Sequence, residues 1–340
     1  MKDKLKNVFK FLLFLSLGVL LMYLAYQGAD FTEIKNVIGE ANFFWVGVSL
    51  FLGIISNVSR AMRWNILIKP LGYQPRLANT FFAVMIMYLA NLAIPRLGEV
   101  SRCGVLTKYE KVPFTKLLGT VFLERVVDLI MLLVLFAFVL VAQFHVVVQF
   151  IADNPEISSK LNWLLESKIF LGSIFFGFFV LFYIFWKLRN KISHFTLYKK
   201  IKELVINFVE GLKTIKHMEQ KWAFIGHTVF IFTLYFLMIY VVFFAFDFTS
   251  HIDVLTGLTI FVISCFGMVA PVQGGVGAWH FMVMKAMVIY GIAEKPYGQA
   301  FAFLAHSTMT LMVLVVGFLT LIALPIYNRR IEKQNTVAAN

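Results

Sequence analysis

Three charged residues, Arg96, Glu99 and Arg102, lie three positions apart in a polar segment, residues 95–102, that interrupts an apolar region. If a helix begins near Leu97, Glu99 and Arg102 share one face and can pair, while Arg96 lies at the positive end of the helix dipole. Guanidinium groups and free backbone N–H groups at a helix start bind phosphate. The segment therefore predicts a phosphate site. The alternative is a salt-bridged plug that closes a turn.

A second interruption, residues 271–277, carries glycine in place of charge: Gly274, Gly275 and Gly277. Glycine lets backbone amides approach a ligand headgroup closely, or lets two helices pack tightly. Two matched breaks in apolar helices indicate the binding site of a membrane carrier, because non-helical backbone survives in lipid only where protein or a water-filled cavity satisfies it. We therefore predict a substrate site at the two breaks.

Two carboxylates, Glu124 and Asp128, lie four positions apart on one face of a predicted helix. Such a pair suits general acid–base work or a proton relay. The neighbouring Arg125 cannot point the same way. The alternative is charge pairing across the bundle with an arginine: Arg96, Arg102 or Arg60.

Two histidines, His280 and His306, follow the second break. Their spacing does not indicate zinc, so we predict no metal and no cofactor. They could titrate near neutral pH as a pair, or each could simply be hydrogen-bonded in the core. Earlier in the chain, Arg60, Arg63 and Trp64 are expected at the cytoplasmic headgroup level as topology anchors, with phosphate capture as the alternative.

The composition predicts an all-α membrane bundle, because 60% of the residues are hydrophobic and 14% are charged, against roughly 25% charged residues in soluble domains. Apolar stretches of spanning length are expected at 8–26, 43–59, 117–143, 169–186, 222–246 and 298–325. Two more, 77–94 and 254–270, lead into the breaks, and shorter ones leave them at 97–107 and 277–291. This gives six spans and two re-entrant hairpins, or eight spans by hydropathy alone.

Lysine and arginine are distributed unevenly between alternate loops. The N-terminus, the loops at 60–76 and 108–116, the 187–221 segment and the tail hold 23 of them, against four in the loops between. The excess places both termini in the cytoplasm. Residues 77–107 then enter from inside and 254–291 from outside, so the two halves form an inverted repeat.

The expected organisation has five parts in chain order. They are a first half-repeat (1–143), an external loop with the first span of the second half (144–186), a basic linker (187–221), the remaining half-repeat (222–328) and a cytoplasmic tail (329–340). The linker has apolar residues at helical spacing opposite lysines, typical of a surface helix on anionic lipid or of a connector with a solvated basic face.

The net charge of +13 is explained by membrane orientation and anionic headgroups, and no nucleic-acid-binding signature accompanies it. The sequence contains no Walker loop, nucleophile elbow or HExxH pair. These features favour transport over catalysis. The expected partners are anionic membrane lipids and a lipid-modifying enzyme in a cell membrane, and the sequence does not indicate an oligomeric state.

Taken together, four stretches resemble the transmembrane region of lysylphosphatidylglycerol synthases and their flippase-like relatives: SRAMRW (59–64), PRLGEVSR (95–102), VFLERVVDL (121–129) and PVQGGVGAW (271–279). The resemblance implies lipid translocation. The synthase's soluble aminoacyl-transfer domain has no counterpart here, so the resemblance does not imply lysyl-lipid synthesis by this chain. His280 stands where the family often has glutamate, and His306 stands near a family arginine.

The expected function is a flippase-type carrier that works by alternating access on an anionic phospholipid or a lipid-linked phosphate. Arginine, amides and glycines at the breaks should prefer an anionic group to a purely cationic one. The alternative is a membrane enzyme, or an enzyme accessory, that acts on a lipid-linked substrate with Glu124 and Asp128 as acid–base groups.

Overall fold

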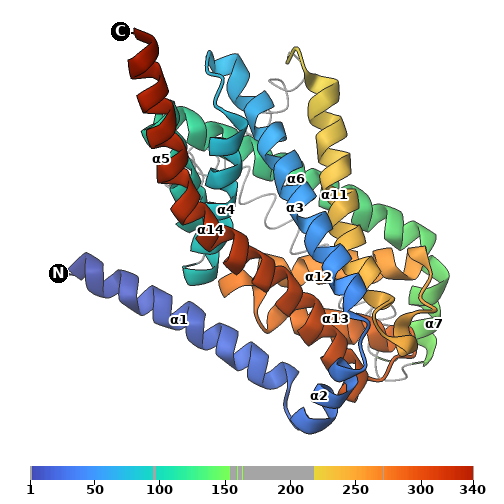
Figure 1. Ribbon diagram of the computed structural model, residues 1–340. Helices are drawn as coiled ribbons and strands as arrows, with labels where there is room; N and C mark the ends of the chain where they lie inside the picture. The colour runs from blue at the N-terminus through green and yellow to red at the C-terminus, as the bar shows by residue number, and fades with distance from the viewer. Residues whose placement is uncertain are drawn as a thin grey trace, which may run out of the picture. The chain divides into compact units, whose positions relative to one another are not determined.

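The computed structural model describes residues 2–94, 97–153, 159, 163, 218–270 and 272–339. Within these ranges the regular structure is helical and no strand occurs, which confirms the all-α class (Figure 1). The α-helices are α1 (Lys2–Ala25), α2 (Phe31–Gly39), α3 (Phe43–Ile68), α4 (Leu77–Ala93), α5 (Leu97–Glu110), α6 (Phe114–Ala142), α7 (Phe144–Asp153), α11 (Lys221–Phe243), α12 (Val254–Val269), α13 (Ala278–Ile289) and α14 (Gln299–Ala339). Arg96, the expected 169–186 span and residues 187–217 of the expected linker lie outside the described residues.

Four helical segments among the described residues are long and apolar enough to cross a membrane: Phe43–Leu71, Phe114–Ala142, Lys221–Phe243 and Glu294–Gln334. Each overlaps a predicted span. The segment from Phe43 continues past the predicted end at 59, because Arg60 and Arg63 are buried within the bundle and do not end the helix at its surface.

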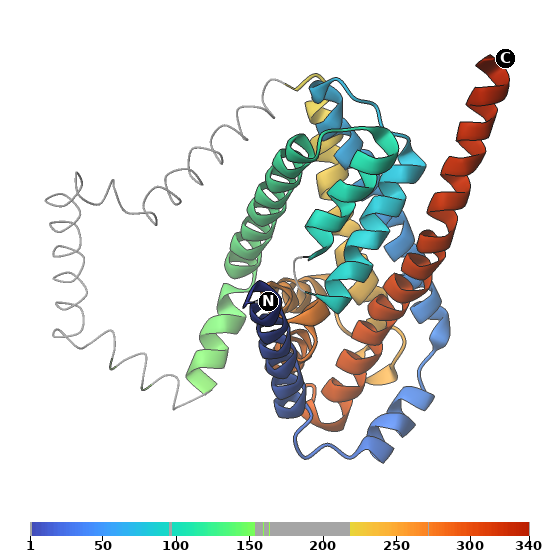
Figure 2. The same cartoon turned by 90° about the vertical axis from the view of Figure 1, so that its left-hand side faces the viewer.

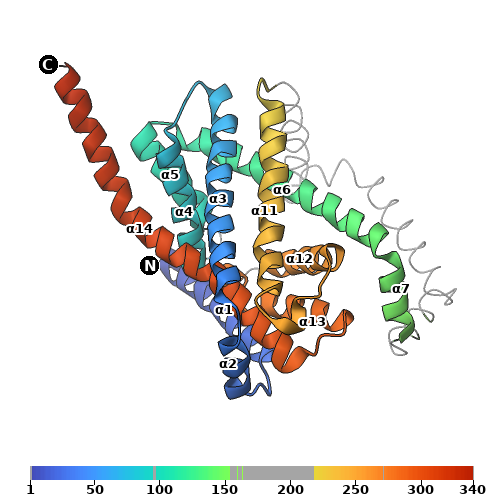
Figure 3. The same ribbon diagram turned by 45° about the vertical axis from the view of Figure 1, so that its right-hand side comes forward.

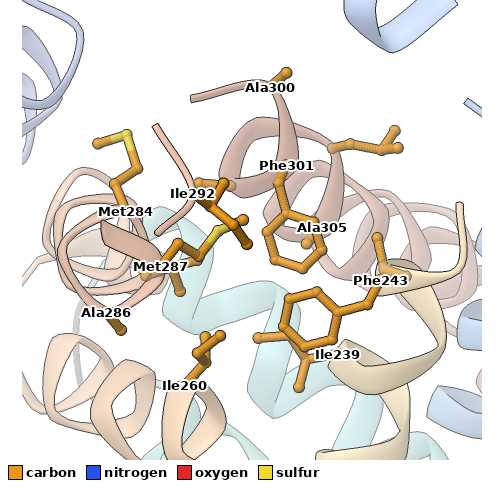
Figure 4. Close-up of a cluster of buried hydrophobic side chains, with 14 of the residues drawn as sticks. Ile239, Phe243, Ile260, Met284, Ala286, Met287, Ile292, Ala300, Phe301 and Ala305 are labelled. Carbon is orange, nitrogen blue, oxygen red and sulfur yellow. The ribbon is translucent and has the colours of Figure 1, made fainter. Parts of the chain in front are cut away.

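Two compact units are present, one made of residues 1–139 and 220–340 and the other of residues 140–219. In the first, α3 packs along α11, and the two helices run side by side (Figure 3). The core joins α11, α12, α13 and α14 (Figure 4). At its centre Phe243 of α11 stacks on Phe301 of α14 with ring centroids 4.5 Å apart. The second unit contains α7.

The helices on either side of each break pack against each other as a pair. α4 lies beside α5, where the two run together in Figure 2, and α12 packs on α13. Glycine permits both contacts: a methyl group added at Gly98 would overlap the Met87 carbonyl oxygen, and one at Gly267 would lie 2.7 Å from Trp279 Cα. At 14 and 12 residues, α5 and α13 are about 21 and 18 Å long, against a hydrocarbon layer of about 30 Å.

The second break packs against α4 and α1 inside the first unit. The second break forms a 3₁₀ turn at Gln273–Gly275, and Gly274 has a φ of 56°, in the left-handed region that glycine adopts freely. A methyl group at Gly274 would lie 2.7 Å from Leu92 Cδ2, near the end of α4. The turn also touches α1, so α1, α4 and the second break converge.

Loop residues fix where several helices begin. The Asp253 carboxylate accepts hydrogen bonds from the backbone N–H groups of Leu255 and Thr256 at the start of α12, and from the Thr256 hydroxyl at 2.6 Å. These bonds, the hydroxyl's first among them, hold the pKa of Asp253 below its usual value. Asp30 caps α2 in the same way.

Candidate functional site

A buried carboxylate, Glu124 of α6, lies among three arginines from two other helices. Glu124 Oε1 is 2.7 Å from Arg60 Nη2 and 3.1 Å from Arg63 Nη2, both on α3. Glu124 Oε2 is 2.9 Å from Arg102 Nη1 on α5. The Glu124, Arg63 and Arg102 side chains are fully buried, and Arg60 is 3% exposed. α3, α5 and α6 therefore meet through charged groups that are shielded from solvent.

Asp128, one helical turn after Glu124, completes the cluster. Its two carboxylate oxygens lie 2.7 Å from Arg63 Nη2 and 3.1 Å from Arg60 Nη2. The alternative that the sequence left open, charge pairing of Glu124 across the bundle, is the arrangement found, with Arg60 and Arg102 among the partners. We call Arg60, Arg63, Arg102, Glu124 and Asp128 the arginine cluster.

The arginine cluster carries more positive than negative charge. Its three guanidinium groups face two carboxylates, and the half-exposed Arg125 adds a contact of 4.0 Å to Asp128. Several buried guanidinium nitrogens have no hydrogen-bond partner among the described residues: Arg60 Nε, Arg63 Nε, Arg102 Nε and Arg102 Nη2. Buried charge is costly unless it is paired and hydrogen-bonded. The cluster therefore has unused capacity to bind an anion.

Aromatic side chains hold the arginines in place. Arg60 Nη1 donates to the hydroxyls of Tyr235 at 2.8 Å and Tyr88 at 3.1 Å. The Arg102 guanidinium lies over the Trp64 ring, 4.6 Å from its centroid, in cation–π contact. Trp64 Nε1 in turn donates to Thr120 on α6. These contacts fix the guanidinium planes before any ligand arrives.

Arg60, Arg63 and Trp64 do not lie where the sequence placed them. Trp64 and Arg63 have no exposed surface, so in this structure they offer none to a headgroup at a membrane surface. The expectation of a surface anchor is wrong, because the two carboxylates of α6 neutralise these arginines inside the bundle.

Glu99 does not pair with Arg102. The predicted pair shares a helix, but Arg102 turns to Glu124 on α6, and the buried Glu99 Oε2 has no hydrogen-bond partner among the described residues. Across the bundle, Glu124 also binds Arg60 and Arg63, and Arg102 gains the Trp64 ring. The arrangement therefore satisfies more groups than a pair within α5 would.

The second break and the two histidines form a separate group, which we call the histidine pair. The rings of His280 (α13) and His306 (α14) lie 4.5 Å apart, and both side chains are buried. His306 Nε2 contacts the Gly274 carbonyl oxygen at 2.9 Å, and His280 Nδ1 accepts from the Gly277 N–H at 3.3 Å. The histidines thus hold the backbone of the second break. Gly275 has a φ of 75° in the same turn.

Three functional candidates escaped the sequence reading: Tyr88, Tyr235 and Gln273. Each lies in an apolar stretch or a break where a single polar residue carries little signal. Their positions become informative only because Arg60 lies beside both tyrosines, and because the amide of Gln273 is buried without a partner for its nitrogen. Among the described residues, no group of three or more His, Cys, Asp or Glu side chains is placed to hold a metal ion.

Comparison with known proteins decides the family. The family model described as "Lysylphosphatidylglycerol synthase TM region" matches residues 7–338, nearly the whole chain. The protein belongs to this family. The resemblance recognised in the four sequence stretches is therefore confirmed, and the chain is a multi-pass integral membrane protein.

Curated relatives of this member of the lysylphosphatidylglycerol synthase TM family are archaeal. UPF0104 membrane protein MJ1595 of Methanocaldococcus jannaschii is 32% identical over 48% of this chain and 46% of its own length, and MJ1078 of the same organism is 30% identical over 38% and 50%. The chain thus spans about half the length of these relatives. Glycosyltransferase AglD of Haloferax volcanii is 26% identical over 34% of this chain and 18% of its own length. No solved structure matches.

Proposed function

We propose that this chain is a lipid carrier of the flippase type, which moves an anionic phospholipid or a lipid-linked phosphate across the bilayer. The observation that carries the proposal is the arginine cluster. It holds three buried guanidinium groups against two carboxylates, with four guanidinium nitrogens unpartnered among the described residues. Arginine binds phosphate through paired N–H donors that are stronger than neutral ones.

In this proposal the lipid phosphate replaces Glu124 as the partner of Arg102 during transport. A phosphate approaching Arg102 exchanges for the Glu124 carboxylate, which keeps Arg60 and Arg63 as partners. The exchange leaves no charge unpaired, so the cluster can bind and release an anion without a large desolvation cost. The histidine pair supports the second break and serves as a candidate proton relay.

We further propose that the two packed helix pairs are re-entrant hairpins related by an inverted repeat, which alternate access to the site. The short lengths of α5 and α13 and the contact of Gly274 with Leu92 near the two breaks support this assignment. The uneven loop charges support cytoplasmic termini in a cell membrane. The expected partners are anionic lipids.

A second candidate is a membrane enzyme, or an accessory to one, that acts on a lipid-linked substrate in envelope lipid or glycoconjugate metabolism. It is favoured by the likeness to a relative that is named a glycosyltransferase. Glu124 and Asp128 would then be the acid–base groups, but arginines hold both of them. A general acid must reach its substrate, whereas Glu124 has no exposed surface and both of its oxygens contact arginines. The carrier is therefore the stronger proposal.

Purified protein in liposomes distinguishes the two candidates. We expect headgroup translocation without chemical change for phosphatidylglycerol or a polyprenyl phosphate, and less for a purely cationic lipid. Arg102→Ala should abolish translocation in folded protein, because it removes the guanidinium group that binds the phosphate. Arg76→Ala is the matched control, since Arg76 is 43% exposed and outside the cluster. A chemically altered lipid, or full transport by Arg102→Ala, contradicts the carrier proposal.

A further inference from the structure

A partly open pocket lies between α1 and the second break. Its volume is about 630 Å³, within the range of pockets that hold small ligands. Leu15, Val19 and Met22 of α1 line one side, and Gln273 and Val276 of the break line the other. The lining is largely hydrocarbon, so the occupant that fits it is an apolar chain.

A single buried amide interrupts this apolar lining. The Gln273 side chain is more than nine-tenths buried, and its Nε2 has no hydrogen-bond partner among the described residues. A methyl group added at Gly18 of α1 would lie 3.6 Å from Gln273 Oε1, which places the amide at the α1 wall. Leaving a buried donor unsatisfied costs free energy. The position therefore indicates an acceptor oxygen supplied by a ligand.

The space opens onto an exposed apolar face of α1. Val19 and Tyr23, which line it, are each 62% exposed on α1, a surface that faces lipid in a membrane-spanning chain. The space also adjoins the second break: Tyr26, another lining residue, makes an edge contact with the His280 ring at 5.8 Å between centroids. A ligand can therefore enter from lipid and contact the residues that support the break.

We propose that this space binds one hydrocarbon chain of a glycerophospholipid, with Gln273 Nε2 donating to the oxygen that joins the chain to glycerol. Such a lipid places one acceptor oxygen at the start of a hydrocarbon chain. The oxygen can accept from Gln273 Nε2 while the chain contacts the apolar lining of the space. A polyprenyl phosphate has no such oxygen along its chain. The assignment rests on the proposed carrier function, because it identifies this lipid as the transported one and so selects glycerophospholipid over polyprenyl phosphate.

The test is photo-crosslinking in phosphatidylglycerol vesicles that contain a trace of the same lipid with a diazirine in its chain. Mass spectrometry of wild-type protein should find label in residues 15–31 or 273–276. Gly18→Leu, which fills the space, should abolish that label. The matched control is Gly47→Leu, because Gly47 has no atom near its added Cβ. Gln273→Leu should weaken labelling about fivefold through the loss of one hydrogen bond.

Lipid transport measured on the same samples separates the two proposals. If Gly18→Leu removes the label but the wild type transports no lipid, chain binding is supported and the carrier proposal is refuted. Label that Gly18→Leu and Gln273→Leu leave unchanged overturns the chain site. Transport that both variants leave intact overturns the assignment of the bound lipid as the transported one. If Gly18→Leu does not fold, Gln273→Leu decides. A polyprenyl phosphate probe that labels the space as strongly as the glycerophospholipid overturns the lipid class.

Discussion

Replacement of Glu124 by glutamine tests the electrostatics of the arginine cluster most directly. Glu124 has three arginine partners at 2.7, 3.1 and 2.9 Å and no exposed surface. Glutamine keeps the shape but removes the charge, so the excess of arginines over carboxylates in the cluster rises from one to two. Removing one partner of a buried ion pair costs about 3–5 kcal/mol. We expect Glu124→Gln to lose stability in that range.

A second substitution should restore part of this loss. Arg102→Met in the Glu124→Gln background removes the arginine whose carboxylate partner was Glu124, and returns the excess to one positive charge. Residues in one ion-pair network show coupling energies of about 0.5–3 kcal/mol. The double variant should therefore lose less free energy of unfolding than the two single variants lose in sum. Transport should stay absent, because Arg102 is the residue proposed to donate hydrogen bonds to the phosphate.

Thermal unfolding of the purified variants in detergent measures these effects, with liposome transport recorded in parallel. Arg125→Gln is the control, since Arg125 is 43% exposed and reaches Asp128 only at 4.0 Å; an exposed pair of this kind contributes at most about 1 kcal/mol. Wild-type stability in Glu124→Gln would refute the buried cluster. Restored transport in the double variant would show that Arg102 only neutralises Glu124 and binds no phosphate.

Two further predictions concern the helix pairs and the topology. Gly98→Ala should destabilise the protein by about 1–3 kcal/mol, because the new methyl group meets the Met87 carbonyl. Gly104→Ala in the same helix is the control, because its methyl group has open space and should be neutral or stabilising. Equal stability of the two variants would contradict the close α4–α5 contact. In a background without native cysteines, impermeant thiol reagents should label Lys108→Cys only from the cytoplasmic side and Ser250→Cys only from outside. Labelling of both from one side would refute the inverted repeat.

Local sequence features were enough to find the helices and the family. The apolar stretches 77–94 and 254–270 correspond to α4 and α12 within a residue. A proline, Pro95 or Pro271, follows each stretch directly and disfavours helical backbone in the residue before it. Asp253 likewise marks the start of α12 through its own short-range hydrogen bonds. Such signals depend on neighbours in the chain, so they can be read without the fold.

Side-chain partners and depth depended on how separate helices pack. Helical spacing showed that Glu124 and Asp128 share a face, but it could not show that α3 would present Arg60 and Arg63 to that face, 61 residues and more away in sequence. For the same reason the sequence expected Trp64 at a surface and Glu99 as the partner of Arg102. Only the packing of α1 on the second break shows that Gln273 Nε2 is buried without a hydrogen-bond partner among the described residues. Periodicity specifies which residues share a helix face, whereas the tertiary contacts between helices decide which charges that face meets.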